Sequence, residues 1–185
     1  MSIRIETPLT RETAKSLRVG DEVLLSGIIY TARDAAHKRL VECLDRGEEL
    51  PLSLQDVMIY YVGPTPEKPG QVIGSAGPTT STRMDAYAPR LMEQGVRGML
   101  GKGRRSAEVV ESMKAHDAVY FGAIGGAAAL LAKCVVDCEI VCYEDLGAEA
   151  VRRLTVKDLP ATVVIDTTGE NLYEIGVQRY LDSLT

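Results

Sequence analysis

Three cationic side chains stand where the sequence passes from an expected strand to an expected helix. Arg33 lies in "TARDA", Arg83 in "TRMDA", and Lys102 between two glycines in "GKGRRS". The first turn of a helix already carries the positive end of the helix dipole, so a cation there is favourable only if it faces an anion. Arginine holds a carboxylate through two parallel hydrogen bonds. The pattern therefore predicts a binding site for a small molecule that carries two carboxylates.

Helix capping is the alternative explanation of the same turns. Thr31 stands three residues before Asp34, and Thr82 stands three residues before Asp85. Both pairs fit a capping box in which the acid is an aspartate. Taken singly, each turn is more often a capped helix with an arginine on its surface. The anion site is favoured because three such turns tend to meet at one edge of an α/β sheet.

Two threonines, Thr79 and Thr80, precede the second turn in the stretch "GPTTSTRMD". A hydroxyl group is a poor base alone, but it relays a proton when a carboxylate or another base lies beside it. Turn formation and capping explain the same residues without any chemistry. From spacing alone, the structural explanation is the favoured one.

The elements that must position these turns alternate between strand and helix. Glycine and proline cluster in "VGPTPEKPG" (62–70), which either separates two halves or forms one long loop inside a single domain, 1–185. The repeated strand–loop–helix units predict an α/β fold whose working loops lie at the strand ends. The expected strands are 21–31, 56–64, 96–100, 118–123, "EIVCYED" and "TVVIDTTG"; the expected helices are 32–47, 84–94, 106–116 and "AAALLAKC", the second preceded by the apolar run "QVIGSA".

Composition limits the class of protein. The chain has 185 residues, a net charge of −5, one Phe and no Trp, which argues against a nucleic-acid-binding surface. The start "MSIRIETPLT" contains no apolar signal segment, and the longest apolar runs are too short to cross a bilayer. We therefore expect a cytoplasmic protein without a membrane span.

The cysteines and histidines do not form a recognisable metal motif. Cys134, Cys138 and Cys142 follow one another at intervals of four among Val and Ile, and we expect them to pack in the core as reduced thiols. His37 and His116 are isolated in the sequence. The stretch "GAIGG" (122–126) departs from the dinucleotide fingerprint, and the chain has no phosphate loop or nucleophile elbow.

Four segments together resemble class I, iron–sulfur fumarate hydratases, specifically their beta subunit or C-terminal domain. They are "SGIIYTARDAAHKR", "IGSAGPTTSTRMDAY", "GKG" and "YFGAIGGAAALLA", in this order and at about the family's spacing. The L-tartrate dehydratase beta subunits are close relatives of that family. The resemblance runs from "LRVGDEVLLSG" to "LPATVVIDTTGENLY", which is nearly the whole chain.

The resemblance implies a swivelling β/β/α domain that closes over a [4Fe–4S] cluster. The cluster is held by the cysteines of an alpha subunit, so the expected assembly is a hetero-oligomer and this chain binds no metal itself. Arg33, Arg83 and Lys102 match the family's substrate-binding residues. Thr79 matches its proposed catalytic base, assisted by an aspartate of the alpha part, and Lys102 is carried over as a second catalytic residue.

The sequence departs from the family in two places. Many relatives have "GPTTAGRMD", so Ser81 and Thr82 are bulkier here, and the stretch between Arg83 and Lys102 is one residue shorter than in some relatives. The expected activity is the reversible hydration of fumarate to L-malate. The alternatives are an L-tartrate dehydratase beta subunit, a dicarboxylate-binding module without chemistry, and a purely structural subunit.

Overall fold

Two long strands form the centre of the protein. The computed structural model describes residues 2–123 and 128–183. Strand β2 (Glu22–Thr31) pairs antiparallel with β7 (Val151–Ile165) along nearly its whole length. On its other edge β2 pairs in parallel first with β1 (Ile3–Thr7) and then with β3 (Met58–Tyr60). Each long strand therefore connects two different parts of the sheet.

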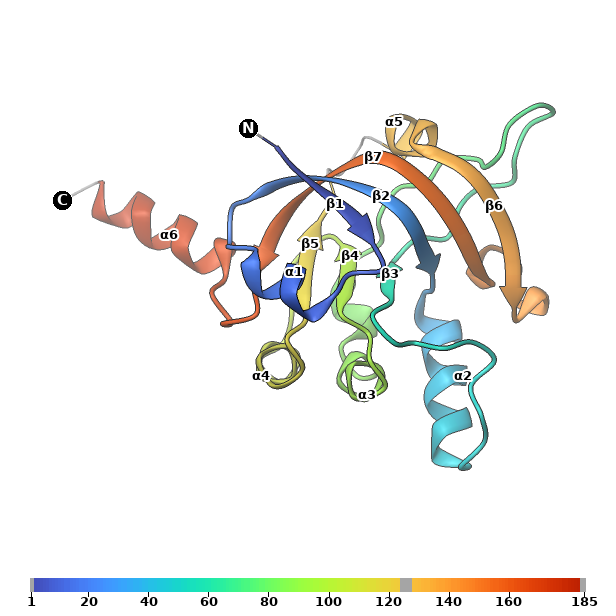
Figure 1. The fold of residues 1–185 in the computed structure, drawn as a ribbon, viewed down its shortest axis with the longest axis horizontal. Coiled ribbons are helices and arrows are strands. Elements are labelled where there is room, and N and C mark those ends of the chain that lie inside the picture. The colour runs from blue at the N-terminus through green and yellow to red at the C-terminus, as the bar shows by residue number, and fades with distance from the viewer. Residues whose placement is uncertain (1, 124–127, 184–185) are drawn as a thin grey trace.

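The sheet closes on itself through these two strands (Figure 1). Strand β3 pairs in parallel with β4 (Gly98–Gly101), and β4 pairs in parallel with β5 (Val119–Gly122). Strand β5 then pairs antiparallel with the end of β7, which completes a ring of five strands. Strand β6 (Val135–Cys142) lies outside this ring and pairs with the beginning of β7.

Apolar side chains fill both sides of the parallel strands. Met58 and Tyr60 of β3 point into one cluster of buried residues, whereas Ile59 between them belongs to a second cluster. The second cluster packs under the helices α2 (Asp34–Asp45), α3 (Ala88–Glu93) and α4 (Ala107–His116), which lie along one side of the strands in Figure 1. Strands buried on both faces explain why β3, β4 and β5 have nearly continuous apolar sequences.

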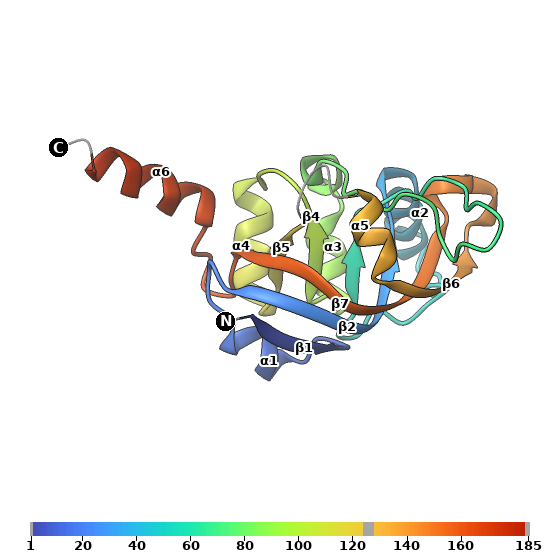
Figure 2. The ribbon, with the colours of Figure 1, turned by 90° about the horizontal axis from the view of Figure 1, so that it is seen from above.

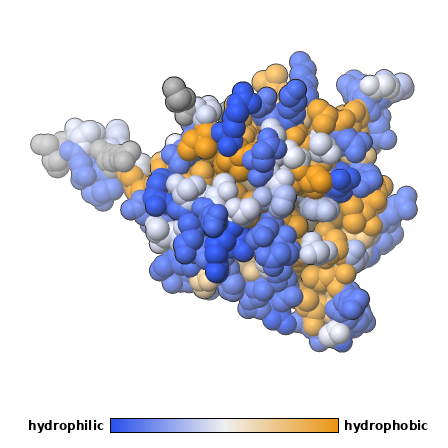
Figure 3. Space-filling view, in the orientation of Figure 1, coloured by the Kyte–Doolittle hydropathy of each residue, from blue (hydrophilic) through white to orange (hydrophobic). Residues whose placement is uncertain are grey.

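The remaining helices are short or peripheral. They are α1 (Arg11–Ser16), the 3₁₀ helices η1 (Ser81–Met84) and η2 (Glu144–Glu149), α5 (Ala128–Lys133) and α6 (Leu172–Asp182). Helix α6 projects from the body in both ribbon views (Figures 1 and 2). Figure 3 shows a hydrophobic area on the side where β6 lies, and Val136, Ile140 and Val141 of that strand are exposed. Among the helices of the described residues, none combines the length and apolar character needed to cross a bilayer.

Several elements confirm the sequence predictions. The segments 21–31 and 118–123 contain β2 and β5, 96–100 covers all of β4 except Gly101, and 32–47 contains α2. Helix α4 begins after Ser106, whose hydroxyl accepts a hydrogen bond from the Val109 amide at 3.3 Å, as expected for an N-cap. The fold is a mixed α/β arrangement, as predicted.

Other predictions were wrong in extent. The strand in 56–64 covers only Met58–Tyr60, and 84–94 divides into the end of η1, a turn and α3. Strand β6 begins at Val135, before "EIVCYED", and β7 begins at Val151, before "TVVIDTTG". Most of β7 was missed because Arg, Lys and Asp interrupt its apolar residues and Pro160 lies inside it.

Elements near the two ends were not predicted at all. They are β1, α1 and α6, which are short or have weak apolar patterns. The loop "GAIGG" falls partly on residues 124–127, which lie outside the described residues, as does the first residue of "AAALLAKC".

A substitution of Gly101, at the end of β4, tests how tightly the residues at this edge of the sheet are packed. A Cβ at this position would lie 2.1 Å from Ser81 Oγ and 2.9 Å from Tyr61 Cδ2. We expect Gly101→Ala to lower the free energy of unfolding by about 1–3 kcal/mol, because the buried neighbours must move. Urea unfolding measures this. Gly176→Ala is the control, since nothing lies within 4 Å of that Cβ, and we expect it to be neutral or slightly stabilising. Equal stability of the two variants would contradict the packing argument.

Candidate functional site

The carboxyl ends of β2, β3 and β4 bring the predicted residues to one edge of the sheet. These strands run in parallel, so the segments that follow them leave from the same edge. Arg33 is the N-cap residue of α2, two residues after the end of β2, and Lys102 directly follows β4. The long connection after β3 returns to this edge before η1.

Backbone hydrogen bonds place Thr79 between the ends of β3 and β4. The Thr79 amide donates to the Tyr61 carbonyl at 2.7 Å, and the Ser81 amide donates to the Lys102 carbonyl at 2.9 Å. Thr80 and Lys102 form an isolated parallel bridge. The threonine loop therefore continues the sheet edge, and Thr79 lies beside the loop that carries Lys102.

Both arginines face carboxylates of their own chain. Arg83 forms an ion pair with Asp34 in the first turn of α2. Arg33 Nη2 lies 3.3 Å from Glu149 Oε1, at the end of η2. Asp34 thus links the Arg83 segment to the Arg33 segment. Lys102 is exposed and forms no ion pair within residues 2–123 and 128–183.

Two buried polar atoms at this edge are left unsatisfied by the protein. Arg33 Nε and Asp34 Oδ1 are buried, and neither has a hydrogen-bond partner among the described residues. A buried donor or acceptor without a partner costs free energy. Both atoms lie below the surface, so this local cost must be offset by the surrounding packing and ion pairs.

The capping box predicted for the first turn is wrong. Thr31 is buried in the sheet, where its hydroxyl donates to the Ala150 carbonyl at 3.3 Å and accepts from the Arg152 amide at 3.0 Å. The free amide of Ala35 is instead satisfied by Glu149 Oε2 at 3.0 Å. A carboxylate from a distant part of the chain replaces the local cap, so the Thr31 side chain is free to join β2 to β7.

The capping box predicted for the second turn is also wrong. Thr82 is exposed within η1, and Asp85 is the C-cap of that helix. The Asp85 carboxylate accepts hydrogen bonds from Arg105 Nε at 2.6 Å and from the Ser106 amide at 2.7 Å. Asp85 therefore stabilises the start of α4 and fixes the loop that contains Lys102.

A buried polar network supports the two loops from below. The Arg105 guanidinium is fully buried and lies 5.3 Å from the ring centre of Tyr61 and 5.0 Å from that of Tyr120. The Tyr120 hydroxyl donates to the Gly103 carbonyl at 2.9 Å. Since a phenol has one proton, Ser81 must donate its own hydroxyl proton to Tyr120, at 2.8 Å. The bulkier Ser81 of this sequence thus has a buried partner.

His37 lies directly beneath Arg33. Its Nδ1 is 2.9 Å from the Arg33 carbonyl, and its ring packs edge-on against Tyr61 at a centroid distance of 5.3 Å. Because a carbonyl only accepts, Nδ1 carries the proton. Burial lowers the pKa of His37 to about 4. The histidine that is isolated in the sequence is therefore a neutral group that holds the N-cap residue in place.

The cysteines pack against the two cores only in part. Cys134, Cys138 and Cys142 are partly exposed, whereas Cys43 on α2 is buried. Burial raises the pKa of all three partly exposed thiols, that of Cys142 to about 11. The prediction of core packing was therefore too strong for this strand. Among the described residues, no group of three or more His, Cys, Asp or Glu is placed to hold a metal ion.

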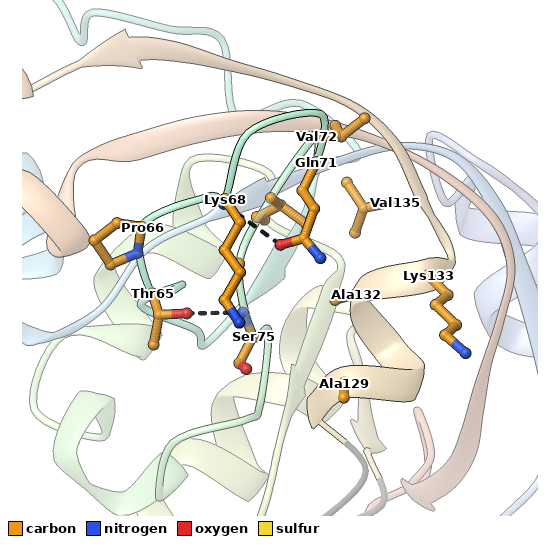
Figure 4. Close-up of a pocket in the computed structure, with 12 residues that line it drawn as sticks. Thr65, Pro66, Lys68, Gln71, Val72, Ser75, Ala129, Ala132, Lys133 and Val135 are labelled. Atoms are coloured by element: carbon orange, nitrogen blue, oxygen red, sulfur yellow. Dashed lines mark hydrogen bonds between the residues drawn. The ribbon is translucent and has the colours of Figure 1, made fainter.

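A cavity of about 420 Å³ lies beside the candidate site, between the loop after β3 and the helix α5 (Figure 4). Lys68, Gln71 and Thr65 line it on the loop side, and Ala129 and Ala132 on the helix side. None of the predicted site residues lines this cavity. The cations at the sheet edge therefore lie outside this cavity.

Comparison with known proteins identifies the family. The "Fumarase C-terminus" family model matches residues 1–176. The class I aerobic fumarate hydratase of Salmonella typhimurium is 42% identical over 158 residues, 84% of this chain and 27% of that protein. The anaerobic class I enzyme of Escherichia coli is 40% identical over 169 residues, 90% of this chain and 31% of that protein.

A small subunit is also among the relatives. The putative L(+)-tartrate dehydratase subunit beta of Methanocaldococcus jannaschii is 39% identical over 172 residues, 90% of this chain and 88% of that protein. The chain belongs to the fumarase C-terminus family. It spans less than a third of the class I fumarate hydratases named above, but most of the length of the tartrate dehydratase subunit.

The buried ion pair below the loops can be tested by substitution. Arg105→Met leaves the Asp85 carboxylate without its buried partner, and we expect it to lower the free energy of unfolding by about 3–5 kcal/mol. Arg104, the exposed neighbour, is the control, and Arg104→Met should change stability by no more than about 0.5 kcal/mol. Urea unfolding of both variants checks this. Similar values for the two would show that the buried pair contributes little.

His37 predicts a defined pH dependence of stability. Its pKa falls from 6.5 to about 4 on folding, so the unfolded chain binds the extra proton between these values. Stability is therefore complete above pH 6.5 and is lost as the pH falls towards 4, by at most about 1.4 kcal/mol per pH unit. Urea unfolding of the wild type and of His37→Gln across this range isolates the effect, because carboxylates titrate in both. If the free energies of unfolding of the two proteins changed equally with pH, that result would contradict a neutral, buried His37.

Proposed function

We propose that this chain is the beta subunit of a two-subunit class I fumarate hydratase, which hydrates fumarate reversibly to L-malate. The observation that carries the proposal is the meeting of Arg33, Thr79, Arg83 and Lys102 at one edge of the sheet. These four residues come from three separate segments, and each matches a position of the family motif. A dicarboxylate is the ligand that two arginines and a lysine suit best.

A partner subunit follows from the lengths of the relatives. The class I fumarate hydratases contain more than twice as many further residues as this chain supplies, whereas the tartrate dehydratase beta subunit is about as long as this chain. We propose that a separate alpha subunit provides the rest of the active site. This domain would swivel to close over it, in a cytoplasmic hetero-oligomer.

The [4Fe–4S] cluster of the family does not fit this chain's own residues. Cys134 and Cys138 pack against the core and Cys142 against the second cluster, and burial keeps these thiols protonated. Cluster ligands must be thiolates. We therefore propose that the alpha subunit holds the cluster.

The arginines would hold the substrate's carboxylates. Their present partners, Asp34 and Glu149, belong to partly exposed ion pairs, which are typically worth only about 0–1 kcal/mol. Such pairs orient the guanidinium groups while leaving several N–H donors for a ligand. Lys102, whose ammonium is exposed, would add a third positive charge and assist the proton transfer.

Thr79 would carry the proton of the reaction. Hydration of fumarate adds hydroxide to one alkene carbon and a proton to the other, and dehydration of malate removes that proton. The Thr79 hydroxyl has no hydrogen-bond partner among the described residues, so it is free to meet a substrate and a carboxylate of the alpha subunit. That carboxylate would supply the basicity that a hydroxyl lacks.

An L-tartrate dehydratase beta subunit is the second candidate. The close match in length to a putative subunit of that kind favours it. Tartrate differs from malate by one hydroxyl group, so both substrates must be assayed. A dicarboxylate-binding module without chemistry and a structural subunit remain as outcomes of the same experiment.

The test is anaerobic turnover by this chain alone and by the chain co-expressed with a cluster-bearing alpha subunit. Loss of fumarate is followed by its ultraviolet absorbance, and tartrate is assayed in parallel. Activity with fumarate in the pair only is the expected result. Activity with tartrate alone would select the second candidate, and an inactive pair with a full complement of cluster would contradict both.

Thr79→Ala tests the proton-transfer role within the active pair. We expect normal assembly and cluster content, with kcat lowered by roughly 10²–10⁴-fold because the proton carrier is lost. Thr80→Ala is the matched control, since its exposed side chain forms no hydrogen bond with the described residues and its bridge to Lys102 uses the backbone. Near-normal turnover of Thr79→Ala would mean that Thr79 serves only the structure of the turn.

A further inference from the structure

We propose that Glu149 is a positioning residue for Arg33, which holds the guanidinium in the orientation that binds a substrate carboxylate. This inference rests on the proposed function of Arg33 in substrate binding. Nothing in the local sequence points to it, because the two residues are 116 positions apart. The contacts of Glu149 with Arg33 and Ala35, and the support of the segment that carries Glu149, give it this role.

One carboxylate serves both the side chain of Arg33 and the helix that Arg33 begins. Glu149 Oε1 lies 3.3 Å from Arg33 Nη2, and Oε2 accepts a hydrogen bond from the Ala35 amide at 3.0 Å. Arg33 is the N-cap residue of α2 and makes no capping bond with its own side chain. Glu149 therefore fixes the guanidinium relative to the backbone from which it extends.

Gly63 also lies against the Arg33 side chain, and the absence of a Cβ on this glycine leaves room for it. A Cβ on Gly63 would lie 2.9 Å from Arg33 Nη1, 3.0 Å from Arg33 Cδ and 3.2 Å from the Ala148 carbonyl. The arginine side chain thus packs closely against the backbone of Gly63, next to the end of η2. This confinement selects one orientation out of the many that an arginine otherwise samples.

The segment that carries Glu149 is held to its neighbours at several points. Asp145, at the other end of η2, forms a two-point ion pair with Arg39 of α2, with N–O distances of 2.8 and 2.5 Å. The carbonyl of Ala150, the next residue after Glu149, accepts the hydrogen bond from the Thr31 hydroxyl. Glu149 is therefore presented to Arg33 from a supported position between α2 and β2.

The charges of this cluster explain why Glu149 orients Arg33 without blocking it. A guanidinium has five N–H donors, and Glu149 is 3.3 Å from one of its nitrogens, Nη2. The Arg33 side chain is 22% exposed, so donors of its Nη groups remain for a ligand. Without Glu149, the binding of substrate must itself order the arginine, and the affinity falls by that cost.

The first experiment needs no partner and no turnover. In the full chain labelled with ¹⁵N-arginine, the Arg33 Nε–H signal is assigned by its loss in Arg33→Lys, and its hydrogen exchange is measured. We expect about tenfold faster exchange in Glu149→Ala than in the wild type, because the side chain is released. Glu144→Ala is the matched control on the same helix, because the exposed Glu144 side chain forms no ion pair or hydrogen bond with the described residues, and exchange of Arg33 Nε–H should stay close to wild type. Unchanged exchange in Glu149→Ala overturns the proposal.

The second experiment measures the consequence in the complex with the alpha subunit. We expect Glu149→Ala to raise KM for the dicarboxylate roughly tenfold and to change kcat by less than about twofold. Glu149→Gln keeps an acceptor for Ala35 and should restore part of the affinity. Glu144→Ala should leave KM unchanged, and an equal rise in both variants would contradict a specific role of Glu149.

A double-mutant cycle separates positioning from a general structural effect. In an Arg33→Lys background, Glu149→Ala should cause little further rise in KM, because its effect acts through the guanidinium. A full additional tenfold rise would overturn the proposal. A complex inactive with fumarate and tartrate would refute the proposed function instead, and the exchange measurement would still decide whether Glu149 holds Arg33.

Discussion

The antiparallel pairing of β2 with β7 is the constraint on which the rest of the structure depends. It closes the ring of strands, because β2 also pairs with β3 and β7 also pairs with β5. The parallel strands between them then have a common edge. Thr31 bonds to β7 at the end of this pairing, one residue before Ala32 and two before Arg33, so the closure of the sheet also determines where the first arginine leaves it.

Polar groups buried beneath this edge of the sheet hold the loops of the candidate site in place. Arg105 and Asp85 join the end of η1 to the start of α4, and Tyr120 joins Ser81 to Gly103. These contacts are costly to break because burial removes the alternative of hydration. The loops that carry Thr79 and Lys102 are therefore held by the core, while the Thr79 side chain stays partly exposed and the Lys102 side chain is exposed.

Internal carboxylates give the site its electrostatic character. Asp34 and Glu149 balance the charges of Arg83 and Arg33, so the cluster is stable before any ligand binds. Because these pairs are partly exposed, they stabilise the fold only weakly and are suited to orienting the arginines. The chain spans less than a third of the length of the class I fumarate hydratases named above.

The sequence by itself determined the family, most of the parallel strands, the N-cap at Ser106 and the residues at the site edge. It did so because apolar runs, glycine loops and the motif around Arg83 are local patterns. Only the tertiary structure decided the partners: Thr31 bonds to β7 and not to its helix, Asp85 caps a different helix, and Glu149 caps α2 from 114 residues beyond Ala35. Long-range pairing places these groups together, and a hydrogen bond depends on distance in space and not on separation along the chain.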